Sequence, residues 1–420
     1  MRLVPLKGPI EATVAIPGSK SYTNRALIMG AIAGDVRIEN PLISDDTEAM
    51  LRCLEVLGVT FKRETDAIHI LNTLTTQEGE TYELDANISG TTIRFLLPLI
   101  CCIPGTKILF GKEGLNKRPI GDLVDGLRQI DARIEYADKE GFPPLKVTSA
   151  GLQSGVIKMS GAVSSQYFSA LLMISPLLEG GIVIEVQGSQ ISKPYIDMTI
   201  DSMRQFGVEV INEGYKRYVV QGGEIYSAKT YKVEGDVSSA SYFAAIAALT
   251  KSKITLSNMN PHSMQADMEF LKILEKMGAK VSFGENSITV EGHGVKPLEV
   301  DMESCPDQAQ TLAVLAAFAD GVTKITGVRS LRVKETERVK AVEQELAKMG
   351  IRTESTPDSL TIYGGNPKSA AIDTYGDHRM AMSFAVAGTK LAGMEINDPD
   401  VVGKTFPEFW DKLKSLKANQ

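Results

Sequence analysis

The chain has 420 residues, of which 43% are hydrophobic and 23% are charged, a composition typical of a soluble globular protein. Its length predicts two domains, because a domain usually holds about 100–200 residues. The net charge of −7 argues against a nucleic-acid surface, which usually carries a basic excess, but it does not exclude an anionic small-molecule substrate.

Neither a membrane segment nor a metal site is expected. The sequence contains no stretch of about 18 uncharged apolar residues and begins without a signal-peptide core, so we expect a cytoplasmic protein. The four cysteines have no metal-like spacing, and the four histidines are dispersed along the chain. A protein-built metal site needs such groups close together, so none is predicted.

Six short polar clusters each open an apolar helix, and they recur at nearly constant spacing. Taken in order, they are 70 to 74 residues apart and are marked by Gly18, Gly90, Gly161, Gly235, Pro306 and Gly376. A fixed period indicates copies of one supersecondary unit. Because this period is close to one sixth of the chain, we expect six copies.

The first copy shows the elements of the unit in chain order. Helical periodicity and alternation predict helices over 24–33 and 45–57 and strands over 36–39, 59–62 and 67–70. With a strand ahead of the first polar cluster, one copy reads β-α-β-α-β-β. Later copies reuse the second helix and its glycine stop, as residues 270–277 do before Gly278.

One such unit buries only part of its apolar surface, so three copies are expected to share a helical core in each of two domains. The first strand, expected at residues 3–5, stands apart from its own copy and is expected to pair with the C-terminal half. The predicted domains are therefore residues 1–16 plus 234–420, and residues 17–233. The fold class is α/β, with two similar domains and an active-site cleft between them.

The helix starts of the N-terminal half carry groups that suit anions. Free backbone N–H groups at a helix start attract anions, and Lys20, Ser21 and Arg25 add an ammonium, a hydroxyl and a guanidinium there. Further donors are the paired hydroxyls of Ser164 and Ser165 with Gln166, the loop residues Ser192 and Tyr195, and Arg118 just ahead of a helix. Simple helix capping and solvated basic side chains remain open as alternatives.

The C-terminal half places cations where the helix dipole disfavours them. The sequence indicates Lys334 and Arg338, Arg379 and Lys404 near helix N-termini, which implies a compensating bound anion. Asp307 is either a helix cap or a carboxylate able to take a proton from a substrate hydroxyl. Together the two halves suggest a reaction between two anionic small molecules.

These motifs resemble the 5-enolpyruvylshikimate-3-phosphate synthase family of enolpyruvyl transferases. The resemblance rests on residues 17–25, 89–94, 118–120, 164–166, 192–195, 306–307, 332–338, 376–381 and 404–407, which follow the family order. It implies an inside-out α/β barrel in each domain and a monomer in the shikimate pathway. The implied reaction transfers the enolpyruvyl group of phosphoenolpyruvate to shikimate 3-phosphate and releases phosphate, without a metal or organic cofactor.

The resemblance also implies roles for single residues. Shikimate 3-phosphate is expected to contact Lys20, Ser21, Arg25, Ser164, Ser165, Gln166, Ser192, Tyr195, Asp307, Ser330 and Lys334. Phosphoenolpyruvate is expected to contact Lys20, Gly90, Arg118, Gln166, Arg338, Arg379 and Lys404. Lys20, Asp307, Lys334, Glu335 and His378 are the expected catalytic residues, with Asp307 as the base and Glu335 as the acid.

Two other functions are weighed against this one. A sister transferase acting on UDP-N-acetylglucosamine typically has a cysteine in the loop before its Arg-Pro pair, and residues 114–117 contain none. A non-catalytic protein that binds RNA or phosphate fits poorly with the acidic net charge and with the pair Asp307 and Glu335. Enolpyruvyl transfer to shikimate 3-phosphate is the favoured hypothesis.

Overall fold

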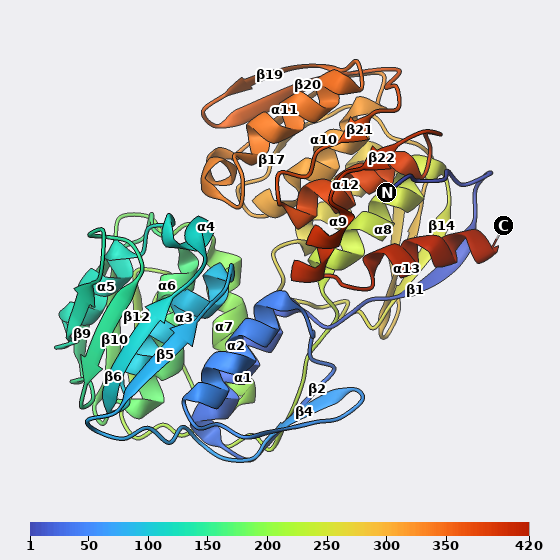
Figure 1. The fold of residues 1–420 in the computed structure, drawn as a ribbon. Helices are drawn as coiled ribbons and strands as arrows, with labels where there is room; N and C mark the ends of the chain where they lie inside the picture. The colour runs from blue at the N-terminus through green and yellow to red at the C-terminus, as the bar shows by residue number, and fades with distance from the viewer. Residues whose placement is uncertain (420) are drawn as a thin grey trace. The chain divides into compact units, whose positions relative to one another are not determined.

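The computed structural model describes residues 1–419, and the chain divides into two compact units (Figure 1). The terminal unit consists of Met1–Pro17 and Glu234–Gln420, and the central unit of Gly18–Val233. Each unit encloses a hydrophobic core of its own. The fold is α/β, and each unit contains three copies of the expected repeat, of which the last copy of the terminal unit is incomplete.

The sheets show how one copy is built. The first strand of a copy lies parallel to the strand that follows the first helix, and two antiparallel strands complete the sheet. The sheets of the central unit have the orders β13 (Thr230–Lys232), β2 (Val36–Glu39), β4 (Ala67–Ile70), β3 (Phe61–Arg63); β5 (Thr81–Asp85), β6 (Gly105–Phe110), β8 (Leu145–Ser149), β7 (Ile134–Tyr136); and β11 (Ile211–Asn212), β12 (Arg217–Gln221), β10 (Gly181–Gln187), β9 (Gly155–Ser160).

The terminal unit repeats this pattern twice in full and once in part. Its sheets have the orders β1 (Glu11–Ala15), β14 (Lys253–Ser257), β16 (Ser287–Glu291), β15 (Lys280–Phe283); β17 (Glu299–Asp301), β18 (Gly321–Thr326), β20 (Ser359–Gly364), β19 (Arg352–Thr356); and the pair β21 (Ala371–Ile372), β22 (Glu395–Ile396). Three separate sheets therefore surround each core, in place of one closed barrel wall.

The first helix of each copy lies at the centre of its unit. These helices are α1 (Lys20–Ala33), α3 (Gly90–Cys101) and α6 (Ser165–Ile174) in the central unit, and α8 (Val237–Thr250), α10 (Ala309–Ala317) and α12 (His378–Gly388) in the terminal unit. Within each unit the three contact one another and are buried along almost their whole length. A helix that is apolar on all sides can be buried in this way, and the shared helical core is confirmed.

The second helices lie closer to the surface. They are α2 (Asp45–Val56), α5 (Gly121–Arg128), α7 (Lys193–Gln205), α9 (Met268–Met277), α11 (Arg338–Lys348) and α13 (Phe409–Ser415), and a short helix α4 (Glu113–Asn116) precedes α5. Each of these six buries one face. Five short 3₁₀ helices are described as well: η1 (Ser175–Leu177), η2 (Pro306–Gln308), η3 (Arg329–Val333), η4 (Pro399–Lys404) and η5 (Leu416–Asn419).

The two units exchange their first strands. β1 precedes α1 in the chain but pairs with β14 of the terminal unit, and β13 precedes α8 but pairs with β2 of the central unit. The expected pairing of the N-terminal strand with the C-terminal half is therefore confirmed, but its position at residues 3–5 was wrong. The strand is Glu11–Ala15, where exposed and buried side chains alternate, as a half-buried strand requires.

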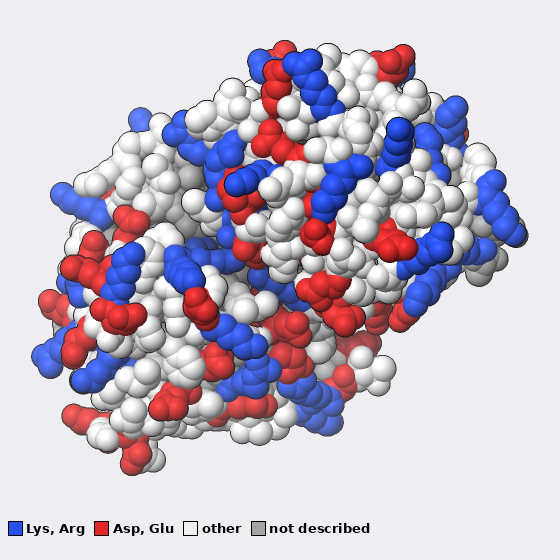
Figure 2. Space-filling view, turned by 45° about the horizontal axis from the view of Figure 1, so that its top comes forward, with Lys and Arg blue, Asp and Glu red and all other residues white. Residues whose placement is uncertain are grey.

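No helix among residues 1–419 is long and apolar enough to cross a membrane. On the face shown in Figure 2, lysine and arginine side chains are interspersed with aspartate and glutamate.

Candidate active site

Arg338 is the centre of a group of buried charges in the terminal unit. It is the first residue of α11, is 2% exposed, and binds three carboxylates. Its Nε lies 2.7 Å from Oδ2 of Asp377, its Nη1 lies 2.9 Å from Oδ1 of Asp307, and its Nη2 lies 2.8 Å from Oε2 of Glu335. Burial opposes the charge, but these three carboxylates outweigh it and raise the pKa of Arg338.

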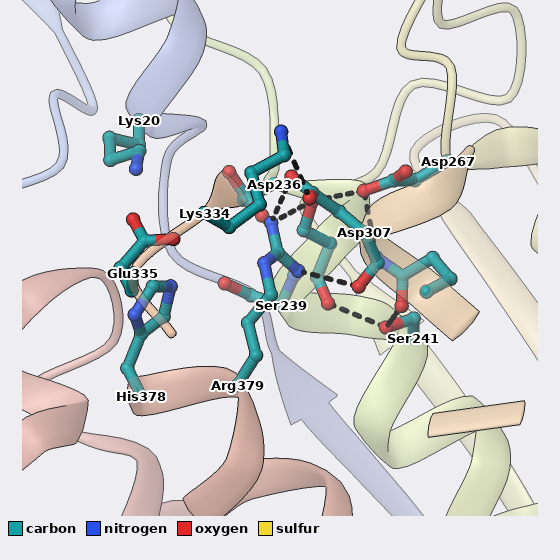
Figure 3. A network of polar contacts seen from close by, with 12 residues as sticks. Lys20, Asp236, Ser239, Ser241, Asp267, Asp307, Lys334, Glu335, His378 and Arg379 are labelled. Atoms are coloured by element: carbon teal, nitrogen blue, oxygen red, sulfur yellow. Dashed lines mark hydrogen bonds and ion pairs between the residues drawn. The ribbon is translucent and has the colours of Figure 1, made fainter. Parts of the chain in front are cut away.

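Three more cations surround the same carboxylates. Nη2 of Arg379 lies 3.2 Å from Oδ2 of Asp307, and Nζ of Lys334 lies 3.7 Å from its Oδ1. Nζ of Lys404 lies 2.9 Å from Oε1 of Glu335. We call this group the charged cluster; it consists of Asp307, Lys334, Glu335, Arg338, Asp377, Arg379 and Lys404, and Figure 3 shows several of its members.

Asp307 is a charge partner rather than a helix cap. It lies inside the 3₁₀ turn η2, and α10 begins two residues later without a side-chain cap. Burial opposes its ionisation, but Arg379, Lys334 and Arg338 together hold its pKa well below the usual range. The helix-cap hypothesis is therefore wrong, and the cations around Asp307 favour its ionised form, while its role as a base stays a prediction.

Local sequence explains why the two arginines stand at helix starts. Asp377 precedes α12 and accepts a hydrogen bond from the backbone N–H of Arg379 at 2.9 Å, as a helix cap does. Its carboxylate also pairs with Arg338, so the same acid compensates a cation next to a helix N-terminus. The expectation was wrong for two lysines. Lys404 ends the 3₁₀ turn η4 while α13 begins only at Phe409, and Lys334 follows the 3₁₀ turn η3 four residues before α11. Lys404 reaches Glu335 from its turn.

The central unit carries a second polar group at the starts of α1, α3 and α6. Nζ of Lys20 lies 3.1 Å from Oδ2 of Asp46, which is 2% exposed. Gln166 bridges two copies, because its Oε1 accepts from Nη1 of Arg94 at 2.7 Å and its Nε2 donates to Oγ1 of Thr91 at 3.1 Å.

Gly90 explains how a second arginine approaches α3. A Cβ atom at Gly90 would lie 2.9 Å from Nη1 of Arg118 and 3.9 Å from Nη1 of Arg94. The first residue of α3 therefore has no side chain because a guanidinium occupies that space. Two guanidinium groups and the free N–H groups of a helix start thus meet near one point, which suits an anion.

Arg25 is buried deeper than a surface anion-binding group. It is 2% exposed, and burial lowers its pKa to about 10. Its Nε donates to Oγ1 of Thr199 at 2.8 Å, and Nη2 donates to the carbonyl of Tyr195 at 3.0 Å and to Oγ of Ser169 at 3.4 Å. Nη1 donates to the carbonyl of Ser21 at 2.9 Å, so Arg25 joins α1, α6 and α7.

Comparison with known proteins agrees with this geometry. The family model described as EPSP synthase (3-phosphoshikimate 1-carboxyvinyltransferase) matches residues 5–413. The chain belongs to the EPSP synthase family.

Relatives and solved structures support this placement along the whole chain. The chain is 42% identical over 415 residues to a 3-phosphoshikimate 1-carboxyvinyltransferase of Sulfurovum sp. (strain NBC37-1), with 97% of each chain covered. It is 41% identical over 430 residues to the protein of that name from Vibrio vulnificus (strain YJ016), covering 99% of this chain and 98% of the relative. A solved EPSP synthase from Acinetobacter baumannii matches with a TM-score of 0.83 at 25% identity, covering 99% of this chain and 97% of that one.

The structure brings together many of the residues expected from the EPSP synthase resemblance. Asp307, Lys334, Glu335, Arg338, Arg379 and Lys404 form the charged cluster, and His378 is 2% exposed beside Asp377, with Nδ1 at 3.6 Å from Oδ1. In the central unit, Ser164 caps α6 through the N–H of Gln166, Ser165 is buried, and Ser21, Ser192 and Tyr195 are half-buried near the starts of α1 and α7. Ser330 differs, because it lies exposed on the 3₁₀ turn η3.

Three charged residues of these groups were missing from the expected site. Asp377 stands inside the Gly-Asp-His-Arg motif and pairs with Arg338, so its place in the motif was an available signal. Arg94 interrupts an apolar helix, where a charge needs a partner, and that partner is Gln166. Asp46 had no such signal, because an acidic residue in the first turn of α2 is ordinary helix chemistry.

Proposed function

We propose that this chain transfers the enolpyruvyl group of phosphoenolpyruvate to the 5-hydroxyl of shikimate 3-phosphate and releases phosphate. Family membership along nearly the whole chain supports this reaction, which belongs to aromatic amino acid biosynthesis. The observation that carries the assignment of roles is the charged cluster, where two carboxylates suited to proton transfer lie among four cations. Such a group can move protons while it balances the charge of anionic substrates.

Asp307 is proposed as the base. It takes the proton of the 5-hydroxyl while that oxygen bonds to C2 of phosphoenolpyruvate, and Lys334 lies beside it to stabilise the developing charge. A carboxylate whose pKa is far below the working pH is a weak base. Substrate anions that bind Arg379 and Arg338 compete with Asp307 for those guanidinium groups, and this competition raises its basicity when both substrates are bound.

Glu335 is proposed as the acid that protonates the methylene carbon in the same addition. Its carboxylate is held by Lys404 and Arg338 at 2.9 and 2.8 Å, and both of these cations are also proposed to bind phosphoenolpyruvate. The addition gives a tetrahedral intermediate that carries phosphate. Loss of a proton from the methyl group and of phosphate from C2 then completes the transfer, and His378 is the candidate to assist there.

The two substrates are assigned to different sets of donors. Phosphoenolpyruvate is proposed to bind Arg338, Arg379 and Lys404 of the terminal unit and Lys20, Gly90, Arg118 and Gln166 of the central unit. Shikimate 3-phosphate is proposed to bind Lys20, Ser21, Arg25, Ser164, Ser165, Gln166, Ser192 and Tyr195, with Asp307, Lys334 and Ser330. The burial of Arg25 and its four protein contacts favour a role in holding α1, α6 and α7 around the phosphate.

Three broader expectations stay predictions. We propose that the chain acts as a monomer, which light scattering after size-exclusion chromatography tests, and in the cytoplasm, which cell fractionation tests. The interdomain cleft expected from the sequence is tested by solving the structure with both substrates bound.

The reaction itself is tested by phosphate release. Purified protein mixed with shikimate 3-phosphate and phosphoenolpyruvate should release inorganic phosphate and form one new enol ether, detected by mass spectrometry. UDP-N-acetylglucosamine in place of shikimate 3-phosphate should give no release. No phosphate release with shikimate 3-phosphate across neutral pH would overturn the assignment.

A further inference from the structure

Asp267 is a buried carboxylate to which the proposed chemistry assigns no task. It directly precedes α9 and is 4% exposed, but its side chain does not cap that helix. Within residues 1–419, its Oδ1 is buried and has no hydrogen-bond partner. Burying a carboxylate with one unsatisfied oxygen costs stability, so its place in the core needs a reason beyond folding.

The other oxygen of Asp267 joins two separate elements. Oδ2 accepts hydrogen bonds from Oγ of Ser238, in the first turn of α8, and from Nε2 of Gln308 at 2.8 Å, at the end of η2. Gln308 is fully buried, and its Oε1 accepts from Oγ of Ser241 at 2.5 Å. The Gln308 side chain is thereby held between Asp267 and Ser241. Figure 3 labels Asp267 and Ser241 in the same polar network as Asp307 and Arg379.

Each of these donors is next to one member of an ion pair in the charged cluster. Oγ of Ser238 lies 3.5 Å from Nη2 of Arg379, and the same nitrogen lies 3.2 Å from Oδ2 of Asp307. Gln308 follows Asp307 directly in the chain. Asp267 therefore holds Ser238, which contacts Arg379, and Gln308, which follows Asp307. Removing the Asp267 carboxylate is expected to displace both Arg379 and Asp307.

The electrostatics agree with a position close to the cluster. Burial raises the pKa of Asp267, while the positive charge of Arg379 lowers it and the negative charge of Asp307 raises it. Arg379 and Asp267 thus lie near enough to influence each other.

We propose that Asp267 is a positioning residue for enolpyruvyl transfer, which holds Arg379 and Asp307 in place through Ser238 and Gln308. The inference rests on the proposed function, in which Arg379 binds phosphoenolpyruvate. Displacing the Arg379 guanidinium is therefore expected to weaken the binding of phosphoenolpyruvate more than the binding of shikimate 3-phosphate.

The experiment measures KM for each substrate and kcat in a phosphate-release assay. Asp267→Ala should raise KM for phosphoenolpyruvate by about tenfold because Arg379 is displaced, and should lower kcat by about tenfold because the base Asp307 is displaced. KM for shikimate 3-phosphate, which Asp307 also contacts, should rise less than KM for phosphoenolpyruvate. Asp267→Asn keeps the size and one acceptor and should show a smaller effect in the same direction. It also keeps the test valid if the alanine variant does not fold.

The control separates positioning from loss of stability. The control residue is Ile362 in β20, which is fully buried. Its strand lies against the C-terminal end of α10, because Gly364 of β20 contacts the carbonyl of Ala316, whereas Gln308 precedes the N-terminal end of that helix. Ile362→Ala should lower the melting temperature without changing either KM. If the Asp267 variants lower the melting temperature and leave KM for phosphoenolpyruvate unchanged, as Ile362→Ala does, Asp267 is structural and the inference is wrong.

A double-mutant cycle tests the route of the effect. Because Asp267 is proposed to act partly through Ser238, the variant Asp267→Ala/Ser238→Ala should raise KM for phosphoenolpyruvate by less than the product of the two single effects. Independent, multiplicative effects would overturn this route. Arg379→Lys is the test of the proposed function itself: an unchanged KM for phosphoenolpyruvate there would remove the role of Arg379, whatever the Asp267 variants show.

Discussion

Replacing Arg338 by methionine should destabilise the terminal unit. Arg338 pairs with three carboxylates, but only one of them, Asp377, is left without a lysine or arginine partner among the described ion pairs. Without the guanidinium, Asp307 still has Arg379 and Lys334, and Glu335 still has Lys404. Asp377 is fully buried and loses the arginine that contacts both of its oxygens, at 2.7 and 3.4 Å. Leaving one buried charge without its partner costs about 3–5 kcal/mol, which is the expected loss in the free energy of unfolding.

The assay uses the only tryptophan of the chain, Trp410. It lies in α13 of the terminal unit and is 8% exposed, so its fluorescence in urea reports the unfolding of that unit. A matched control is Arg352→Met in β19, because Arg352 is exposed and its loss should leave the transition unchanged.

A second substitution tests the cause. In the Arg338→Met background, Asp377→Asn removes the charge left without a partner and should recover about 2–3 kcal/mol of the loss. The reasoning is refuted if Arg338→Met unfolds at the same urea concentration as Arg352→Met, or if Asp377→Asn recovers nothing.

Three further outcomes follow from the geometry. Because its neighbouring cations hold the folded-state pKa of Asp307 below its ordinary value of 3.8, its stabilisation is present above about pH 4 and declines as the pH falls toward the folded-state pKa. The difference in urea stability between the wild type and Asp307→Asn should therefore shrink below about pH 4; a difference that is constant with pH contradicts this. Gly90→Ala places a methyl group 2.9 Å from Nη1 of Arg118 and should raise KM for phosphoenolpyruvate by about tenfold without unfolding the protein; an unchanged KM contradicts it. In Arg25→Lys, the lysine cannot make the four hydrogen bonds of the arginine, so the free energy of unfolding of the central unit should fall by about 2–3 kcal/mol. Urea titration followed by circular dichroism measures this change, and an unfolding midpoint equal to that of the wild type would show that these bonds are dispensable.

Much of the fold could be predicted because the helices and strands of the repeat have clear hydrophobic periodicity within short segments of the sequence. The apolar run after Lys20 predicted α1, and the alternation at 36–39 predicted β2, which the structure confirms at Val36–Glu39. The polar clusters at helix starts likewise indicated where anion-binding groups gather. The start of α1 was harder to place, since it begins four residues before the apolar run, at Lys20.

The partners of the charged side chains depend on contacts between distant segments, so the sequence alone did not specify them. Arg338 meets acids from residues 307 and 377, and Lys20 meets an acid 26 residues away, so only tertiary packing brings these charges together. Glu335, three residues from Arg338, is the one local partner among its acids. The exchange of β1 and β13 depends on pairing across more than 190 residues, where backbone hydrogen bonds carry little sequence signal. By itself, the sequence determined the repeat, the polar clusters at the helix starts and the family; the tertiary structure decided which charges compensate one another, because compensation requires distances of a few ångströms between segments far apart in the chain.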